Sequence, residues 1–380
     1  MTAQSPHSSA ASAAGDASIP RRALVLGRAD EAEEMAAALR RLGVAVAVAV
    51  LEAAPDFDRL GDICAEFRPD VAVPIGPVED PGVLDLVESF GIAIAPSRAG
   101  IDIGARRDAQ LRFASEELGL PVARYAMARS SVEVEQSAGV LGYPCIVSPA
   151  EAGAGESSVV LSAGDIPGAY GRAGGGDVVV ETRVSADVEI VMLAVAGVYF
   201  ESGERRPVIR FCEPIGVARG PEGYVRETWQ PQETTEGEYD AARSVAARVA
   251  RALGGRGVYA VRMLVRRGDV YFAGVGTGPS ATGVVTLSSQ LFDQWALHAR
   301  AIVGAPSEVT MVSPAATSVL EASVPVENVG AALDVAESAV WNCELSSEHS
   351  AWRYGAALAT ADDILEARER ARAVADRALG

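Results

Sequence analysis

Two glutamates, Glu181 and Glu189, have the residue type and spacing best suited to acid–base chemistry in this sequence. Each lies in a run of apolar residues, and the two runs predict separate β-strands. A carboxylate exchanges protons near neutral pH when burial or a like charge raises its pKa. The sequence therefore offers the pair as candidate catalytic groups and leaves open whether either one is desolvated.

All 33 basic residues of the chain are arginines, and lysine is absent. Arginine carries a wide planar fork of donors, whereas lysine carries a compact point charge, so one cannot replace the other at a catalytic position. Chemistry that depends on lysine is therefore closed to this chain.

Cysteine and histidine give no metal-binding pattern. The cysteines are far apart and form no C-x-x-C pair, which predicts buried thiols in a reducing compartment; they are Cys64, Cys145, Cys212 and Cys343. His7, His298 and His349 are also scattered, and His298 falls in a helical pattern where a structural role is expected. We predict no metal site.

The net charge of -18 argues against a nucleic-acid partner or an anionic membrane, because polyanions would be repelled. No apolar run approaches the roughly 18 residues of a membrane span. The first twenty residues are rich in Ala and Ser and lack the basic and apolar regions of a signal peptide, so they predict a disordered tail. A cytoplasmic location is expected.

The elements predict mixed α/β and α+β architecture in three parts after the tail (1–20). Residues 21–118 have buried strands at 23–27, 44–50, 71–74 and 92–95, and helices at 30–42, 83–90 and 106–118, which predicts a parallel sheet. The first strand–helix turn lacks G-x-G-x-x-G, so no dinucleotide fingerprint is present. A central part (119–305) and a C-terminal part (306–380) follow.

Further elements are predicted in the last two parts. RRGD (266–269) between two β-rich runs predicts a hairpin turn. A single strand is expected over 208–218, a helix over 288–302, and a final helix starting at a capping-box-like Thr360–Asp363 pair.

Several stretches together resemble the formate-dependent phosphoribosylglycinamide formyltransferases, a purine-pathway branch of the ATP-grasp superfamily. They are EELGLP (116–121), LGYPCIVSP (141–149), VRETWQPQ (225–232), TGVVTLSSQ (282–290), ALHARAIVGAP (296–306) and GAALATA (355–361). The resemblance implies a parallel α/β N-domain, a two-lobed central ATP-grasp unit, a small C-terminal domain and a homodimer.

Part of the nucleotide site that the resemblance implies is retained. Arg107 matches an arginine near the phosphates. ETRV (181–184) matches the strand whose acid, Glu181, and whose backbone, at Val184, bind adenine. Glu189 matches the acid that takes the ribose hydroxyls. Residual binding of an adenine nucleotide is therefore left open.

The phosphate and metal positions depart from the family pattern. Ser148 and Glu156 stand where the family has lysines, the latter in the glycine-rich loop AEAGAGESS (150–158). The two glutamates that hold magnesium in the family, one on each of two adjacent strands, fall at Arg262 and Gly274. A triphosphate needs cations directed at it, and magnesium needs carboxylates. We therefore assign no cofactor from the sequence and expect no magnesium–ATP chemistry.

The family's substrate positions are also altered. GTGPSA (276–281) replaces a loop with an Arg and an Asp, and Pro77 replaces an acid. Of a terminal arginine pair, one position is Trp352 and only Arg353 remains. The first-turn acid is Asp30, which is one methylene shorter than the family's residue.

The sequence predicts a cleft that binds a small anion. Arg262, at the former metal position, can receive a carboxylate or phosphate directly. Arg107, Arg226 and Arg353 could complete the cleft, and Trp229, Tyr224 and Trp352 could stack a planar ring. The structural alternatives are an ion pair between Arg262 and Glu189, and simple packing of Trp229 and Tyr224.

Three functions remain open on the sequence. The first is a repurposed enzyme, acting without ATP or metal on a small anionic metabolite by elimination, cyclisation or isomerisation, in specialised metabolism. The second is a non-catalytic binding or partner subunit. The third is an ATP-dependent ligase or formyltransferase with altered ligands.

Overall fold

The computed structural model describes residues 19–51, 55–76, 78, 80–151, 153–201, 204–220, 224–322, 324–342 and 355–380. In this part of the chain, no helix is long and apolar enough to span a membrane.

A four-stranded parallel sheet opens the fold, as predicted, with strand order β2-β1-β3-β4. Ala23 and Val25 of β1 face one apolar core with α1, while Leu24 and Leu26 face the other with α2 and α3. Both faces are covered because each strand is a continuous apolar run. The elements are β1 (Arg22–Gly27), α1 (Ala29–Arg41), β2 (Ala45–Val50), α2 (Phe57–Phe67), β3 (Val71–Pro74), α3 (Gly82–Ser89) and β4 (Ala93–Ile94).

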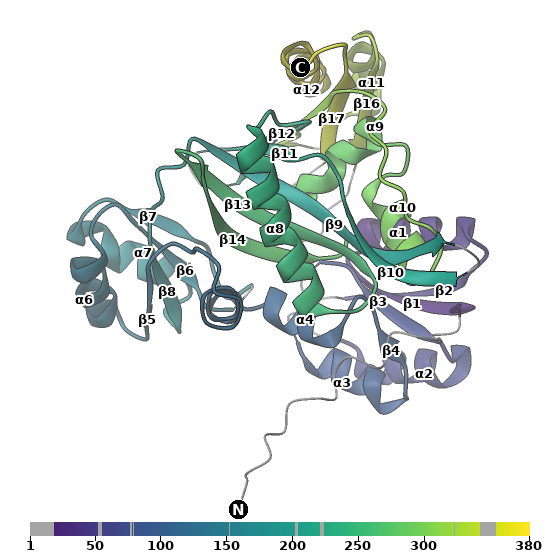
Figure 1. Ribbon diagram of the computed structural model, residues 1–380, viewed down its shortest axis with the longest axis horizontal. Helices are drawn as coiled ribbons and strands as arrows, with labels where there is room; N and C mark the ends of the chain where they lie inside the picture. The colour runs from purple at the N-terminus through teal and green to yellow at the C-terminus, as the bar shows by residue number, and fades with distance from the viewer. Residues whose placement is uncertain are drawn as a thin grey trace, which may run out of the picture.

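A helical segment leads from this sheet into a small antiparallel lobe, which stands apart at the left of Figure 1. The lobe has the strand order β5-β8-β6-β7, with α6 and α7 packed on its apolar core. The elements are α4 (Arg98–Gly104), α5 (Arg107–Arg112), a π-helical turn (Phe113–Glu117), β5 (Tyr125–Ala128), α6 (Ser131–Leu141), β6 (Cys145–Pro149), β7 (Ser158–Val160), α7 (Ile166–Arg172) and β8 (Val178–Thr182).

The largest layer is a nine-stranded sheet with the order β14-β13-β9-β11-β12-β15-β17-β16, in which β10 pairs with β9. Its first elements are β9 (Val188–Glu201), β10 (Glu204–Phe211), β11 (Ile215–Arg219), β12 (Val225–Gln230), α8 (Glu236–Leu253), β13 (Gly257–Arg266) and β14 (Asp269–Thr277). Its remaining elements are α9 (Thr286–Ser289), α10 (Gln294–Ile302), β15 (Ala315–Val319), α11 (Val326–Leu333), β16 (Ser338–Asn342), β17 (Gly355–Thr360) and α12 (Ile364–Leu379).

The two faces of this sheet are covered by different helices. Ile190 and Met192 of β9 pack under α8, which crosses the front of the sheet in Figure 1. Val191 and Leu193 point to the other face, against α10. Because side chains alternate along a strand, Glu189 belongs to the face opposite α8.

Three predicted elements require correction. The predicted helix 288–302 is two helices, because Asp293 caps α10 by accepting a hydrogen bond from the backbone N–H of Ala296. The predicted strand 208–218 is β10 and β11, interrupted at Cys212–Pro214. The final helix is capped by Asp363, which accepts from the N–H of Glu366, whereas Thr360 ends β17.

The predictions for the cysteines and for His298 are confirmed for the described residues. Cys64, Cys145 and Cys212 are buried free thiols, and burial raises the pKa of Cys212 to about 12. His298 is fully buried, and its Nδ1 accepts a hydrogen bond from the N–H of Val258 at 2.9 Å. Burial lowers the pKa of His298 to about 3, so the imidazole is neutral and structural. Cys343, His7 and His349 lie outside the described residues.

Candidate functional site

The first pair of site residues joins α5 to the small lobe. Arg107, at the start of α5, donates two hydrogen bonds to the carboxylate of Glu181 on β8, with Nε to Oε2 at 2.7 Å. This two-pronged geometry fixes both side chains, since guanidinium and carboxylate match as planar forks. A third bond runs from Arg107 to the carbonyl of Ala273 on β14 at 2.7 Å, so the pair also ties the small lobe to the large sheet.

The second group surrounds Glu189 on β9. Arg219, at the end of β11, holds both oxygens of this carboxylate at 2.6–3.0 Å. Arg262 on β13 forms an ion pair with the same carboxylate at 3.9 Å, which is the predicted structural alternative for this arginine. Burial alone would raise the pKa of Glu189, but the bonds from Arg219 and the charge of Arg262 hold it below its ordinary value. Glu189 is therefore an ionised carboxylate already supplied with cations.

Arg262 hydrogen-bonds a backbone carbonyl and not the Glu189 carboxylate. Its Nη2 donates to the carbonyl of Ala273 at 2.7 Å, the same carbonyl that Arg107 contacts. Burial lowers the pKa of Arg262 to about 10, against the attraction of Glu189, so the group stays charged at neutral pH. Its side chain nevertheless keeps 35% of its exposure, and guanidinium N–H groups remain for a ligand.

Arg262 and Gly274 are direct partners in the β13–β14 pairing, which confirms their predicted placement on adjacent strands. A side-chain carbon at Gly274 would lie 3.5 Å from Nε of Arg262. The guanidinium of Arg262 therefore occupies the space beside position 274. The pairing of β13 with β14 thus places a positive charge at these two positions.

The two groups meet at the Ala273 carbonyl and form one site, which we call the arginine cluster: Arg107, Arg219, Arg262, Glu181 and Glu189. Three guanidiniums and two carboxylates give it a formal charge of +1. An excess cation on a protein with net charge -18 favours an anionic ligand at this point.

Opposite the large sheet, the small lobe presents polar groups from its glycine-rich loop. Glu156 accepts a hydrogen bond from the hydroxyl of Tyr224, next to β12, at 2.8 Å. Ser157 donates to the hydroxyl of Ser148 on β6 at 2.9 Å. Tyr224, predicted as a possible ring-stacking residue, thus connects the two lobes.

Other predicted residues lie in different surroundings. Trp229 packs against Ala316 and Ala359 under the guanidinium of Arg368, 3.9 Å from its ring, which is the predicted packing alternative. Arg226 is exposed and pairs with Glu321 at 2.6 Å.

Val184 and Asp30 were also predicted. Val184 lies in the connection after β8, and its carbonyl accepts from the N–H of Ala186 at 3.0 Å. Asp30 lines a hollow of about 430 Å³ between α1 and β16, with Glu33, Glu34, Arg41 and Trp341 among its walls. Arg353, Trp352 and Pro77 lie outside the described residues.

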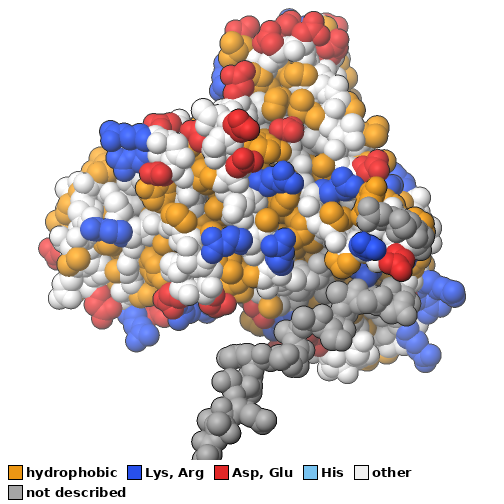
Figure 2. All heavy atoms as spheres, viewed as in Figure 1, with side chains coloured by type: hydrophobic (Ala, Val, Ile, Leu, Met, Phe, Trp, Pro, Cys, Tyr) orange, Lys and Arg blue, Asp and Glu red, His pale blue; other side chains and the backbone are white. Residues whose placement is uncertain are grey.

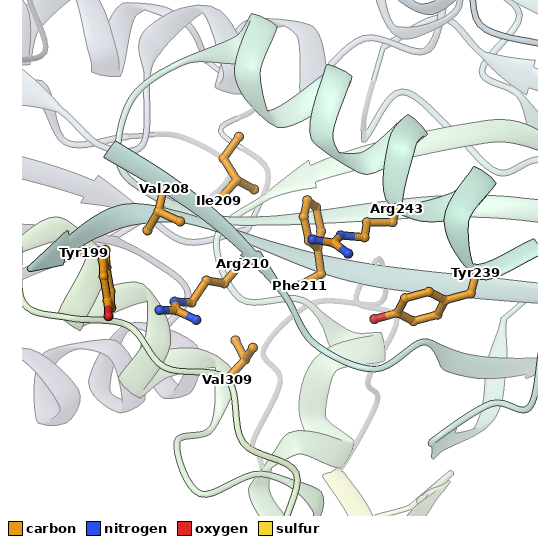
Figure 3. A pocket seen from close by; sticks show the side chains of 8 residues that line it. All are labelled: Tyr199, Val208, Ile209, Arg210, Phe211, Tyr239, Arg243 and Val309. Carbon is orange, nitrogen blue, oxygen red and sulfur yellow. The ribbon is translucent and has the colours of Figure 1, made fainter. Parts of the chain in front are cut away.

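A second hollow, of about 370 Å³, follows β10 (Figure 3). Arg210 stacks over Tyr199 and Arg243 over Phe211. Tyr199 is ten residues beyond Glu189 on β9, or about 33 Å along an extended strand, so this hollow is separate from the arginine cluster. On the face shown in Figure 2, arginines are scattered among apolar groups rather than gathered into one basic patch.

Arg219 is the site residue that the sequence reasoning missed. It ends the strand IGVAR, whose register places Val217 opposite Glu189. The pairing of β11 with β12 shifts register between Ala218 and Arg219, and the side chain of Arg219 reaches the Glu189 carboxylate from there. The pairing of β11 with β9 was the missing information, because the two residues are thirty positions apart.

Comparison with known proteins identifies the family. An ATP-grasp domain model matches residues 113–295. Formate-dependent phosphoribosylglycinamide formyltransferase of Corynebacterium glutamicum (strain R) is 35% identical over 378 residues, covering 92% of each chain. The enzyme of the same name from Burkholderia pseudomallei (strain 668) is 37% identical, covering 93% of this chain and 94% of that one. The chain belongs to the formate-dependent phosphoribosylglycinamide formyltransferase family.

Solved structures agree with this placement. A glycinamide-RNase-transformylase T from Mycobacterium tuberculosis has a TM-score of 0.77 and 33% identity, covering 94% of this chain and all of that one. An ADP complex of an N5-carboxyaminoimidazole ribonucleotide synthetase has a TM-score of 0.81 and covers 97% of this chain and all of that one. At 20% identity, the latter shares the fold. The predicted three-part ATP-grasp architecture is confirmed.

The residues present do not fit the magnesium nucleotide that the family implies. Magnesium needs oxygen ligands in near-octahedral geometry. In a nucleotide site the protein supplies one or two carboxylates, and phosphates and water supply the other ligands. Glu181 and Glu189 are each already bound by arginine, and the paired positions on β13 and β14 carry Arg262 and Gly274.

Proposed function

We propose that this member of the formyltransferase family binds a small anionic metabolite at its arginine cluster without a divalent metal ion. The observation that supports the proposal is Arg262, whose side chain is partly exposed and which the strand pairing sets beside Gly274. Its direct hydrogen bond goes to a neutral carbonyl, so its charge is shared with Glu189 from 3.9 Å. A carboxylate or phosphate can take the remaining donors.

The structure supports the binding of an anion better than it supports catalysis in which Glu181 or Glu189 transfers a proton. A general acid or base works best with a pKa near the operating pH. Glu189 has a lowered pKa and both of its oxygens accept from Arg219. Glu181 accepts two bonds from Arg107. The predicted elimination, cyclisation or isomerisation would therefore need a ligand-borne proton acceptor or displacement of these arginines.

The test is calorimetric titration of the purified protein with inorganic phosphate, in EDTA and again in excess magnesium. We expect binding in EDTA, unchanged within about twofold by magnesium, because the donors belong to the protein. Binding that appears with magnesium alone would overturn the proposal.

A second candidate is the activity named for the relatives, formate-dependent formyl transfer to phosphoribosylglycinamide. It is favoured by identities of 35–37% over more than nine-tenths of the chain. Incubation with formate, ATP, magnesium and phosphoribosylglycinamide distinguishes the two. ADP and formylated product would support formyl transfer, whereas their absence beside metal-free phosphate binding would support our proposal.

The homodimer implied by the resemblance remains a prediction. Light scattering during size-exclusion chromatography measures it: a mass near twice 39.3 kDa would support a dimer, and a mass near 39.3 kDa would contradict it.

A further inference from the structure

We propose that Glu156 is a specificity-determining residue: it limits the arginine cluster to compact ligands with a single carboxylate or phosphate and excludes polyphosphates. The inference rests on the proposed function, because it names the ligand class of the same site.

The backbone holds Glu156 in place. Its N–H donates to the carbonyl of Arg172 at 2.8 Å. At the neighbouring Gly155, a side-chain carbon would lie 2.5 Å from that same carbonyl. At Gly174, a side-chain carbon would lie 2.1 Å from the carbonyl of Ala154. Both glycines have positive φ, so they allow two segments to cross at a distance that other residues would block.

The carboxylate of Glu156 is fixed from the other side by Tyr224, whose hydroxyl donates to it at 2.8 Å. The carbonyl of Tyr224 accepts from the N–H of Gly220 at 2.9 Å. Gly220 directly follows Arg219, the residue that binds Glu189. The carboxylate on the small lobe is therefore connected, through these two hydrogen bonds and the peptide bond between Gly220 and Arg219, to the arginine cluster.

The hydrogen bond to Tyr224, and the chain connection from Gly220 to Arg219, support a negative charge on the small-lobe side of the cationic site. A single phosphate or carboxylate can engage Arg262 without extending toward the small lobe. A polyphosphate carries several charges along its length, and those that reach the loop meet the carboxylate of Glu156. Two like charges about 4 Å apart repel even in water, strongly enough for several-fold discrimination.

The experiment compares inorganic phosphate with tripolyphosphate, both titrated in EDTA, on the wild type, Glu156→Gln and a matched control. Glu151→Gln is the control, because it removes the same charge from the same loop, where Glu151 pairs with Arg106. We expect Glu156→Gln to bind tripolyphosphate about tenfold more tightly and phosphate within twofold of the wild type. Glu151→Gln should change both affinities by less than twofold.

The results separate this inference from the function on which it rests. Phosphate binding by the wild type, with tripolyphosphate affinity equal in the wild type and Glu156→Gln, would overturn the role of Glu156 alone. Equal gains in Glu156→Gln and Glu151→Gln would also overturn it, because the effect would then be one of overall charge. A wild type that binds no phosphate would overturn the proposed function, and this inference with it. Tyr224→Phe keeps the charge but frees the carboxylate, and we expect a smaller gain, about threefold.

Discussion

Two glutamates in this protein, Glu189 and Glu227, each lie between two arginines. We call each group a triad, and the two triads differ in how many of their arginines hydrogen-bond the glutamate. Glu227 on β12 accepts bonds from Arg368 and Arg372, one turn apart on α12. Glu189 on β9 accepts from Arg219 at 2.6–3.0 Å but meets Arg262 at 3.9 Å. Both glutamates are similarly buried, with side-chain exposures of 16% and 14%.

The difference lies in what the second arginine does. Arg368 hydrogen-bonds Glu227 and also stacks on Trp229, so its charge and its flat face are both in use. It fastens the C-terminal helix to the sheet. Arg262 instead donates to the Ala273 carbonyl and shares that acceptor with Arg107. On our proposal, the triad of Glu227 holds structure together, whereas the triad of Glu189 keeps hydrogen-bond donors for a ligand.

The largest expected effect comes from exchanging the second arginine of each triad for glutamine. Arg262→Gln should weaken phosphate binding at least tenfold, about 1.4 kcal/mol, because it removes the guanidinium that keeps donors for a ligand. Its free energy of unfolding should change by less than about 1 kcal/mol, since Glu189 retains Arg219. Calorimetry and urea denaturation measure the two quantities.

Arg368→Gln is the matched control and should show the reverse pattern. It should lose about 1–2 kcal/mol of stability, from one ion pair and the Trp229 stack, and bind phosphate as the wild type does. If both variants lost binding equally, the two triads would not differ in kind.

A smaller effect is expected from removing the glutamate itself. Glu189→Gln removes the carboxylate that Arg219 and Arg262 share, so an added anion can take its place. We expect phosphate to bind about threefold more tightly, measured by calorimetry. Glu227→Gln should show no such gain, because phosphate would have to displace the packed Arg368. Tighter binding in both variants would contradict the distinction.

The smallest effect is the acid dependence of stability. Burial would raise the pKa of each glutamate, but the arginines hold both below the ordinary value of 4.5. A lowered carboxyl pKa contributes stability that is present above pH 4.5 and is lost as pH falls through the folded pKa. Urea unfolding between pH 5 and 3 should therefore fall less steeply for Glu189→Gln and Glu227→Gln than for the wild type. A slope unchanged in either variant would show that its triad is not formed in solution.

Buried His298 lowers the free energy of unfolding of the wild type and of all these variants as the solution is acidified. Its folded pKa of about 3 lies below the ordinary 6.5, so the unfolded state binds a proton first as the solution is acidified. Stability should already decline below pH 6.5 in all of them, which gives a common baseline for the comparison.

The sequence predicted those parts of the fold whose signal is local. The apolar runs at β1, β2 and β3 identified the parallel sheet, because strands buried on both faces carry little else. The break between α9 and α10 was missed, because the cap at Asp293 interrupts a pattern whose apolar periodicity continues. Helix α2 was also missed, although Asp56 caps it by accepting from the N–H of Arg59.

The site was predicted in part for the same physical reason. Arg262 and Gly274 were placed correctly on adjacent strands, since a tight turn fixes the register of β13 and β14. Arg219 was missed, because it reaches Glu189 only through the pairing of β11 with β9. Trp229 was included as a ring-stacking candidate, but its ring is covered by the guanidinium of Arg368. Arg368 lies 139 residues further along the chain, so the sequence could not show this contact.

The most direct test of metal-independent anion binding is calorimetric titration of the wild type with ATP, in EDTA and in excess magnesium. We predict weak binding or none, with the same result in both buffers. The arginine cluster offers no carboxylates free to hold magnesium, and Glu156 repels the polyphosphate. Tight binding that strengthens with magnesium would contradict the account and assign ATP-dependent chemistry to this chain.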